Sequence, residues 1–158
     1  MKILQAGMAE YQVSNEPAML VALGLGSCVG VCMYDSSAKV GGLLHVMLPD
    51  SKLAREGNPP AKFADTGVPL LFNKMRAAGA NPIHTVVKIA GGAQMFKVTS
   101  SSMNIGARNV EAVKEALKQL RLRISAEDTG GTKGRTVKLD NSTGRITVKT
   151  IGTGEKEL

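Results

Sequence analysis

The stretch from Gly24 to Leu48 reads GLGSCVGVCMYDSSAKVGGLLHVML. Two apolar runs, 28–34 and 40–48, flank a short polar segment of turn-forming residues. Their glycines and β-branched residues disfavour a helix and favour strands. We therefore expect the two runs to pair as an antiparallel hairpin with Ser36 and Ser37 at its centre.

Outside this hairpin, the pattern of apolar residues predicts more strands than helices. One helix is predicted from about residue 65 to Ala78, and a second from the N-cap Asn104 to about Leu120. Further strands are predicted at 2–8, 18–23, 83–90, 122–126, 135–139 and 145–151. Because the strands follow one another in runs instead of alternating with helices, the pattern indicates an α+β fold. We expect a single domain over residues 1–158, with a flexible C-terminal tail at about 152–158.

The chain has 158 residues and two cysteines, Cys28 and Cys32. No segment has the length and apolar character of a signal peptide or a membrane span, so we expect a cytoplasmic protein without direct membrane insertion. The C-x-x-x-C spacing differs from the C-x-x-C of redox sites, and no further Cys or His cluster completes a zinc site. Neither a metal nor another cofactor is predicted.

The net charge of +7 raises the question of nucleic-acid binding. However, the positive residues are dispersed, aromatic residues make up only 3% of the chain, and there is no tryptophan for base stacking. Nucleic acid therefore ranks last among the partners considered. A basic surface also suits an acidic protein partner.

Cys28 and His45 are the candidate catalytic residues. With the hairpin centred on 36–37, residues whose numbers sum to 73 face each other, so Cys28 faces His45. A slip of one residue would send His45 to the other face. An imidazole beside a thiol favours a thiolate–imidazolium pair near neutral pH. Glycines ahead of the cysteine let backbone N–H groups approach a ligand, so the backbone of Gly26 and Ser27 is a candidate oxyanion site.

Each of these residues also has a plainer interpretation. A cysteine in an apolar strand is most often a small core residue, and a lone buried histidine is most often hydrogen-bonded to the backbone. Cys32 lies on the same strand face as Cys28 but away from the glycines, which favours a packing role. His84 has no evident thiol or carboxylate partner in the sequence, so we interpret it as structural or exposed.

Several motifs together resemble the CheD family of chemoreceptor glutamine deamidases. They follow in order along nearly the whole chain and are Gly24-Leu25-Gly26-Ser27-Cys28-Val29-Gly30-Val31-Cys32, His45-Val46-Met47-Leu48-Pro49-Asp50-Ser51, Gly91-Gly92-Ala93-Gln94-Met95-Phe96, Ile105-Gly106-Ala107-Arg108-Asn109-Val110 and Asp128-Thr129-Gly130-Gly131. The resemblance implies a bacterial chemotaxis protein that converts selected glutamines of methyl-accepting receptors to glutamate, with release of ammonia through a cysteine thioester. It also implies a layered α/β sandwich with mixed, largely antiparallel sheets, similar to the deamidating-toxin fold, and a CheC-type phosphatase as a partner.

The resemblance places the family's nucleophile on Cys28 and its histidine on His45. The family commonly has a threonine six residues before the nucleophile, where the hydroxyl helps to orient the histidine, but this chain has Ala22 there. Either a backbone carbonyl or another residue orients His45, or the activity is reduced. The alternative function is therefore a binding partner and regulator of a CheC-type phosphatase, with weak or lost deamidase activity.

Overall fold

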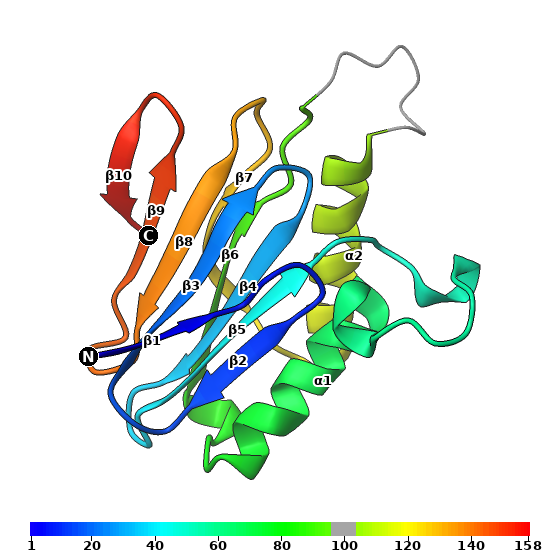
Figure 1. Cartoon of the computed structure of the whole chain (residues 1–158). Helices are drawn as coiled ribbons and strands as arrows, with labels where there is room; N and C mark the ends of the chain where they lie inside the picture. Colours follow the sequence, from blue (N-terminus) through cyan, green and yellow to red (C-terminus); the bar gives the residue numbers. More distant parts are fainter. Residues whose placement is uncertain (96–103) are drawn as a thin grey trace.

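The computed structural model describes residues 1–95 and 104–158, and the strands of this part form two five-stranded sheets (Figure 1). The first sheet has the order β1 (Lys2–Gln5), β3 (Ala18–Leu25), β8 (Arg135–Asp140), β9 (Ile146–Thr150) and β10 (Gly154–Glu157). The second sheet has the order β2 (Tyr11–Ser14), β5 (Val40–Val46), β4 (Val29–Asp35), β6 (Thr85–Gly91) and β7 (Ile124–Thr129). The helices are α1 (Ala64–Ala77) and α2 (Ile105–Gln119), and short 3-10 turns lie at Ser51–Leu53, Pro60–Lys62 and Pro82–His84.

The elements form three layers. Both helices pack on one face of the second sheet, and its other face packs on the first sheet (Figure 1). Within the described residues, neighbouring strands are antiparallel except for the pairs β1–β3 and β6–β7. The predicted α+β sandwich with mixed, largely antiparallel sheets and two main helices is therefore confirmed.

Side-chain alternation along β4 and β5 divides the core in two. Val31 and Leu44 face the helices, where they pack with Leu71 of α1. Cys32 and Leu43 face the opposite way, into the core between the two sheets, which we call the inter-sheet core. Because both faces of these strands are buried, their sequences are apolar almost throughout.

The β4–β5 hairpin forms, but its register differs from the predicted one. Gly30, and not Cys28, pairs with His45, so the strands are shifted by two residues from the predicted pairing. Side chains alternate with a period of two, and a shift of two therefore leaves each side chain on its predicted face. Cys28 and His45 still share the face that points toward the inter-sheet core.

The turn explains the shift. Asp35 and Val40 form the last pair, so the turn covers residues 36–39 and is longer than the tight turn expected. The Asp35 carboxylate accepts hydrogen bonds from the backbone N–H groups of Ser37 (2.9 Å) and Ala38 (3.1 Å). This side-chain capping of the backbone stabilises the longer turn and moves the pairing with it.

Two strands are absent from the sequence-based prediction. β2 is short and pairs with β5, and β10 pairs with β9 where a flexible tail is expected. After β10, the backbone N–H of Leu158 donates to the carbonyl of Ile146 (2.9 Å). β10 reads GEKE and is exposed along its length, so its backbone pairing leaves no apolar pattern in the sequence. The predicted cap of α2 is confirmed, since the Asn104 side chain accepts from the N–H of Ala107.

The chain passes from the first sheet to the second at two places that shape the site. β1 leads through residues 6–10 to β2, and β3 leads through residues 26–28 to β4. Ala6 lies at the start of one crossing and Cys28 at the end of the other. Residues far apart in sequence are thereby brought to the same edge of the inter-sheet core.

Candidate active site

Cys28 lies directly before β4 and is half-buried against the inter-sheet core. The backbone around it is held by the end of β6: the carbonyl of Gly26 accepts from the N–H of Ala93 (2.9 Å), and the carbonyl of Cys28 accepts from Gly92 (2.8 Å). At Gly91, φ is +114°, and a Cβ atom would collide with the Cys28 carbonyl. Only glycine therefore lets β6 end this close to Cys28.

His45 lies on β5, with a side chain only 2% exposed. Its Nδ1 is 3.1 Å from the carbonyl oxygen of Ala6, so a proton on Nδ1 is donated to that carbonyl and Nε2 is left as an acceptor. Nε2 is buried and has no hydrogen-bond partner within the described residues. A fixed imidazole with an unpaired, buried Nε2 is suited to accept a proton from a neighbouring group.

Cys28 and His45 are diagonal neighbours across the β4–β5 pair. Gly30 faces His45 directly and places no side chain between the two residues. Diagonal neighbours on one face of an antiparallel pair have Cα atoms about 7–8 Å apart, a distance that a ring side chain spans. The register therefore favours an approach of the imidazole to the thiol, and the contact itself stays a prediction.

Burial shifts both titrating groups toward their neutral forms. It raises the pKa of the Cys28 thiol, and the hydrogen bond from the residue's own backbone N–H offsets only part of this. Burial lowers the pKa of His45 and outweighs the hydrogen bond to Ala6 and the charge of Glu10, which both raise that pKa. These directions favour a neutral thiol and a neutral imidazole over the thiolate–imidazolium pair expected from the sequence, because desolvation penalises both charges.

The carbonyl of Ala6, which lies beside Ala22, contacts His45 and orients it without a threonine. β1 and β3 run parallel with Gln5 beside Val21, and the N–H of Ala6 donates to the carbonyl of Val21 (2.8 Å). Ala6 therefore lies alongside Ala22, and its carbonyl reaches Nδ1 of His45. Of the alternatives left open by the sequence, orientation by a backbone carbonyl is the one that the structure shows.

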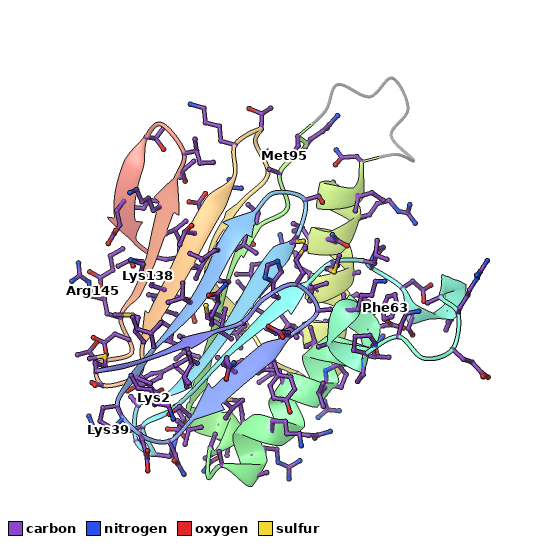
Figure 2. All side chains as sticks on the ribbon, viewed as in Figure 1. Lys2, Lys39, Phe63, Met95, Lys138 and Arg145 are labelled. Carbon is purple, nitrogen blue, oxygen red and sulfur yellow. The ribbon has the colours of Figure 1, made fainter. Side chains whose placement is uncertain are left out.

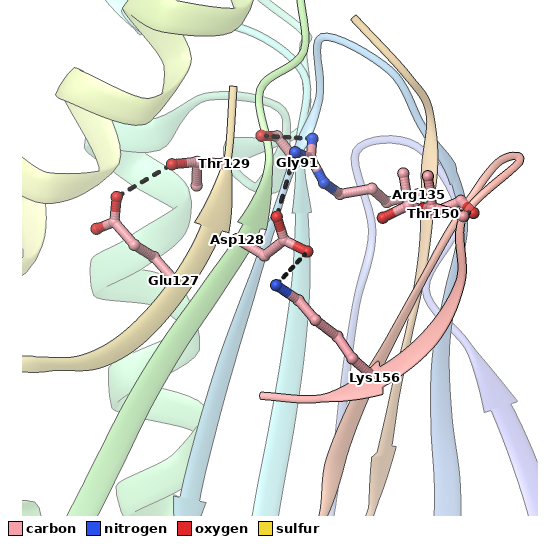
Figure 3. A network of polar contacts seen from close by, with 8 residues as sticks. Gly91, Glu127, Asp128, Thr129, Arg135, Thr150 and Lys156 are labelled. Atoms are coloured by element: carbon pink, nitrogen blue, oxygen red, sulfur yellow. Dashed lines mark hydrogen bonds and ion pairs between the residues drawn. The ribbon is translucent and has the colours of Figure 1, made fainter. Parts of the chain in front are cut away.

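A polar network supports the end of β6 from the side of the first sheet (Figure 3). Arg135 on β8 donates from Nη1 to the carbonyl of Gly91 (3.3 Å) and pairs through Nη2 with Asp128 on β7 (3.3 Å). Lys156 on β10 lies 3.5 Å from the second carboxylate oxygen of Asp128. Arg135 is buried, and these partners offset the free-energy cost of removing its charge from water. The network links both sheets to the segment that holds the Cys28 backbone.

The remaining glycine-containing motifs pack beside the site. The N–H of Gly130 donates to the carbonyl of Gly91 (3.0 Å), and the N–H of Gln94 donates to the carbonyl of Gly131 (2.9 Å). Met95 packs over Gly26 and is half-exposed at this end of the sheets (Figure 2). Phe96, the last residue of the motif at 91–96, lies outside the described residues.

The other sequence candidates lie apart from the site or beside it. Cys32 is buried in the inter-sheet core, and burial raises its pKa to about 12, which agrees with a packing role. His84 is exposed in the turn before β6. Gly26 and Ser27 lie on the same crossing as Cys28, and their role as oxyanion donors stays a prediction.

The motif at 105–110 includes Asn109 on α2, but the sequence predicts no separate role for this residue. Its Nδ2 donates to the carbonyls of Ser27 and Met47, each at 2.9 Å, and its side chain is fully buried. One sequence feature could have indicated this role. Asn109 is a polar residue on the apolar face of an amphipathic helix, four positions before the buried Val113.

Within residues 1–95 and 104–158, no group of three or more His, Cys, Asp or Glu side chains is placed to hold a metal ion. None of the described helices has the length and apolar character needed to cross a membrane.

A family model and the sequences of known relatives agree on one family. The model of a family described as "CheD chemotactic sensory transduction" matches residues 47–150. A protein of Caldanaerobacter subterraneus subsp. tengcongensis, named "Probable chemoreceptor glutamine deamidase CheD", is 52% identical over 99% of this chain and 98% of its own length. A protein of the same name from Clostridium tetani is 45% identical over 99% of this chain and 96% of its own.

Two solved structures align at low identity. YfiH of Bacillus licheniformis aligns with a TM-score of 0.49 and 15% identity, covering 75% of this chain and 49% of its own. The C-terminal domain of CNFy from Yersinia pseudotuberculosis aligns with a TM-score of 0.44 and 9% identity, covering 99% of this chain and 62% of its own.

Proposed function

The chain belongs to the CheD family of chemotaxis proteins, and we propose that it deamidates glutamine side chains of methyl-accepting chemotaxis receptors in the cytoplasm. In this proposal Cys28 is the nucleophile and His45 its proton-transfer partner. The observation that carries the assignment is the state of His45. Its Nδ1 is fixed by the Ala6 carbonyl, while its buried Nε2 has no partner among the described residues and shares a strand face with Cys28.

The first half of the reaction forms a thioester. Neutral His45 takes the thiol proton as the Cys28 sulfur attacks the glutamine carboxamide, so a C–S bond forms and the carbonyl oxygen becomes an oxyanion. Backbone N–H groups near Gly26 and Ser27 stabilise that charge. His45 then gives its proton to the departing nitrogen, the C–N bond breaks, and ammonia leaves.

The second half restores the enzyme. His45 takes a proton from water as the water oxygen attacks the thioester carbonyl. The C–S bond breaks, the proton returns to the sulfur, and glutamate is released as the product. A purified receptor cytoplasmic fragment, assayed for ammonia and mapped by mass spectrometry, tests this function. Failure of the wild-type chain to convert any receptor glutamine would refute it.

The rate should rise with pH as His45 loses its proton. Below its pKa the imidazole is protonated and cannot accept the thiol proton. Because burial lowers that pKa from its usual 6.5, we expect the rise in kcat/KM to lie below pH 6.5 and a plateau through neutral pH. Ammonia release measured from about pH 5 to 9 checks this. A rise centred above about pH 8 would instead identify a solvent-formed thiolate as the reacting species.

Introducing the family's threonine should change the rate little. Nδ1 of His45 carries one hydrogen, and the Ala6 carbonyl already accepts it, so Ala22→Thr is expected to alter kcat by less than about threefold. The added atoms enter a fully buried position, and the expected cost is about 1–3 kcal/mol of unfolding free energy. Steady-state kinetics and thermal unfolding measure the two effects. A gain in kcat of about tenfold or more would mean that the carbonyl alone orients His45 poorly.

Binding to a CheC-type phosphatase remains a second proposal. The alternative function is a regulator of that phosphatase with weak or lost deamidase activity. This alternative rests on Ala22 standing where the family has a threonine. Because the Ala6 carbonyl contacts His45 in place of a threonine, the argument for reduced activity is weaker. A binding titration with the phosphatase, run beside the ammonia assay on the same preparation, separates the two roles.

A further inference from the structure

We propose that Asn109 is a positioning residue for the nucleophile, which holds the Ser27–Cys28 peptide so that the Cys28 N–H faces the reacting carbonyl. The inference rests on the proposed function and goes beyond it, because it assigns a role to a helix residue that does not touch substrate. Asn109 is 0% exposed and donates both Nδ2 hydrogens, one to the carbonyl of Ser27 and one to the carbonyl of Met47. Both acceptors are carbonyls, so the orientation of the carboxamide is settled by its partners.

Planarity of the peptide converts this contact into an orientation of the nucleophile. In a trans peptide, the C=O and the following N–H point in opposite directions. A donor fixed on the Ser27 carbonyl therefore turns the Cys28 N–H to the opposite side of the peptide. That N–H belongs to Cys28, the proposed nucleophile. In acyl-transfer sites, backbone N–H groups of this kind donate hydrogen bonds to the oxyanion.

The same segment is pinned at three successive carbonyls. Those of Gly26 and Cys28 accept from the backbone N–H groups of Ala93 and Gly92, and that of Ser27 accepts from Asn109. Only the middle contact uses a side chain, so substitution of Asn109 releases one peptide while its two neighbours stay bound.

The second contact of Asn109 reaches the strand of the proposed base. Met47 follows β5, two residues after His45. One carboxamide thus joins the nucleophile's loop, the end of the base's strand and α2. This arrangement sets the separation of Cys28 and His45 as well as the direction of the peptide.

Two further observations support a role beyond packing. The Oδ1 atom of Asn109 is buried without a partner in the described part of the chain, which costs stability that an apolar side chain would not. In addition, although burial raises the pKa of the Cys28 thiol, the backbone N–H of Cys28 lowers it. The peptide held by Asn109 supplies that N–H.

The chain offers a matched control in Asn141. It is 1% exposed, its Nδ2 donates to the carbonyls of Ser14 (2.9 Å) and Glu16 (2.8 Å), and its Oδ1 is likewise unpartnered. It also contacts the carbonyl of Lys39, which lies at the opposite end of the molecule from Met95 (Figure 2). Asn109→Ala and Asn141→Ala remove the same buried group, one beside Cys28 and one far from it.

The test compares both variants under conditions where circular dichroism shows each to be folded. For Asn109→Ala we expect kcat for ammonia release to fall by about 100-fold, with KM within about threefold of the wild-type value. The rate of Cys28 alkylation by iodoacetamide at neutral pH should fall by about threefold or more, because less thiolate is present. Asn141→Ala should keep the wild-type kcat and alkylation rate.

Equal kcat values and equal alkylation rates for the two alanine variants would overturn the proposal and leave Asn109 a structural residue. If Asn109→Ala does not fold, Asn109→Ser carries the same test, since its shorter hydroxyl cannot hold both carbonyls. The alkylation rate does not depend on the substrate. A wild-type chain without deamidase activity would therefore refute the proposed function, while the alkylation comparison would still decide the role of Asn109.

Discussion

Replacing Cys28 by alanine will abolish ammonia release from receptor fragments, with a loss in kcat of about 10⁵-fold. The thioester cannot form without the sulfur, and removal of a nucleophile eliminates the covalent pathway as a whole. The fold should survive, because the thiol is half-buried at the edge of the inter-sheet core and its backbone is held by Gly92. We expect the unfolding free energy to change by less than about 1 kcal/mol.

Cys32→Ala is the matched control for this result. It removes the same chemical group four residues further along the chain, on β4, from a site where burial raises the thiol pKa to about 12. Ammonia release should stay near the wild-type rate, while the cavity lowers stability by about 1 kcal/mol. Substantial activity in Cys28→Ala, or its loss in Cys32→Ala, would show that Cys28 is not the nucleophile.

Replacing His45 by glutamine is expected to lower kcat by about 10³-fold. Glutamine retains a polar amide that can donate to the Ala6 carbonyl, but it cannot take the thiol proton or return it to the leaving nitrogen. KM should change much less than kcat, because His45 is almost fully buried and offers little surface to a bound receptor. Initial rates of ammonia release over a range of receptor concentrations separate the two constants.

His84→Gln provides the comparison for the histidine. His84 is exposed in the turn before β6, and its replacement should leave both constants unchanged. If His45→Gln kept kcat within about tenfold of the wild-type value, the base would have to be sought elsewhere.

The sequence predicts the hairpin well because both of its strands are long apolar runs bounded by polar residues. The predicted pairing of Cys28 with His45 is wrong by two residues, since the capping of the turn by Asp35 cannot be read from apolar periodicity. The shared face of Cys28 and His45 is nevertheless correct, because an even shift preserves the alternation of side chains.

The supporting residues are harder to predict because their partners are distant in the chain. Arg135 reaches Gly91, and Asn109 reaches Ser27, through contacts that depend on how the layers stack. The contact of His45 with the Ala6 carbonyl cannot be predicted from the residue type, since every residue has a backbone carbonyl. Local patterns thus predict candidate reacting side chains and miss the groups that contact and orient them.

The two crossings between the sheets give the site a mechanical property. The thiol stands on one crossing, and the carbonyl that fixes the imidazole stands on the other, whereas the imidazole itself is carried by the second sheet. A shear of one sheet along the other would displace the Ala6 carbonyl, which follows β1 of the first sheet, from the imidazole on β5 of the second sheet. We therefore expect the proposed reaction to depend on how the two sheets are aligned, because this alignment sets the contact that orients His45.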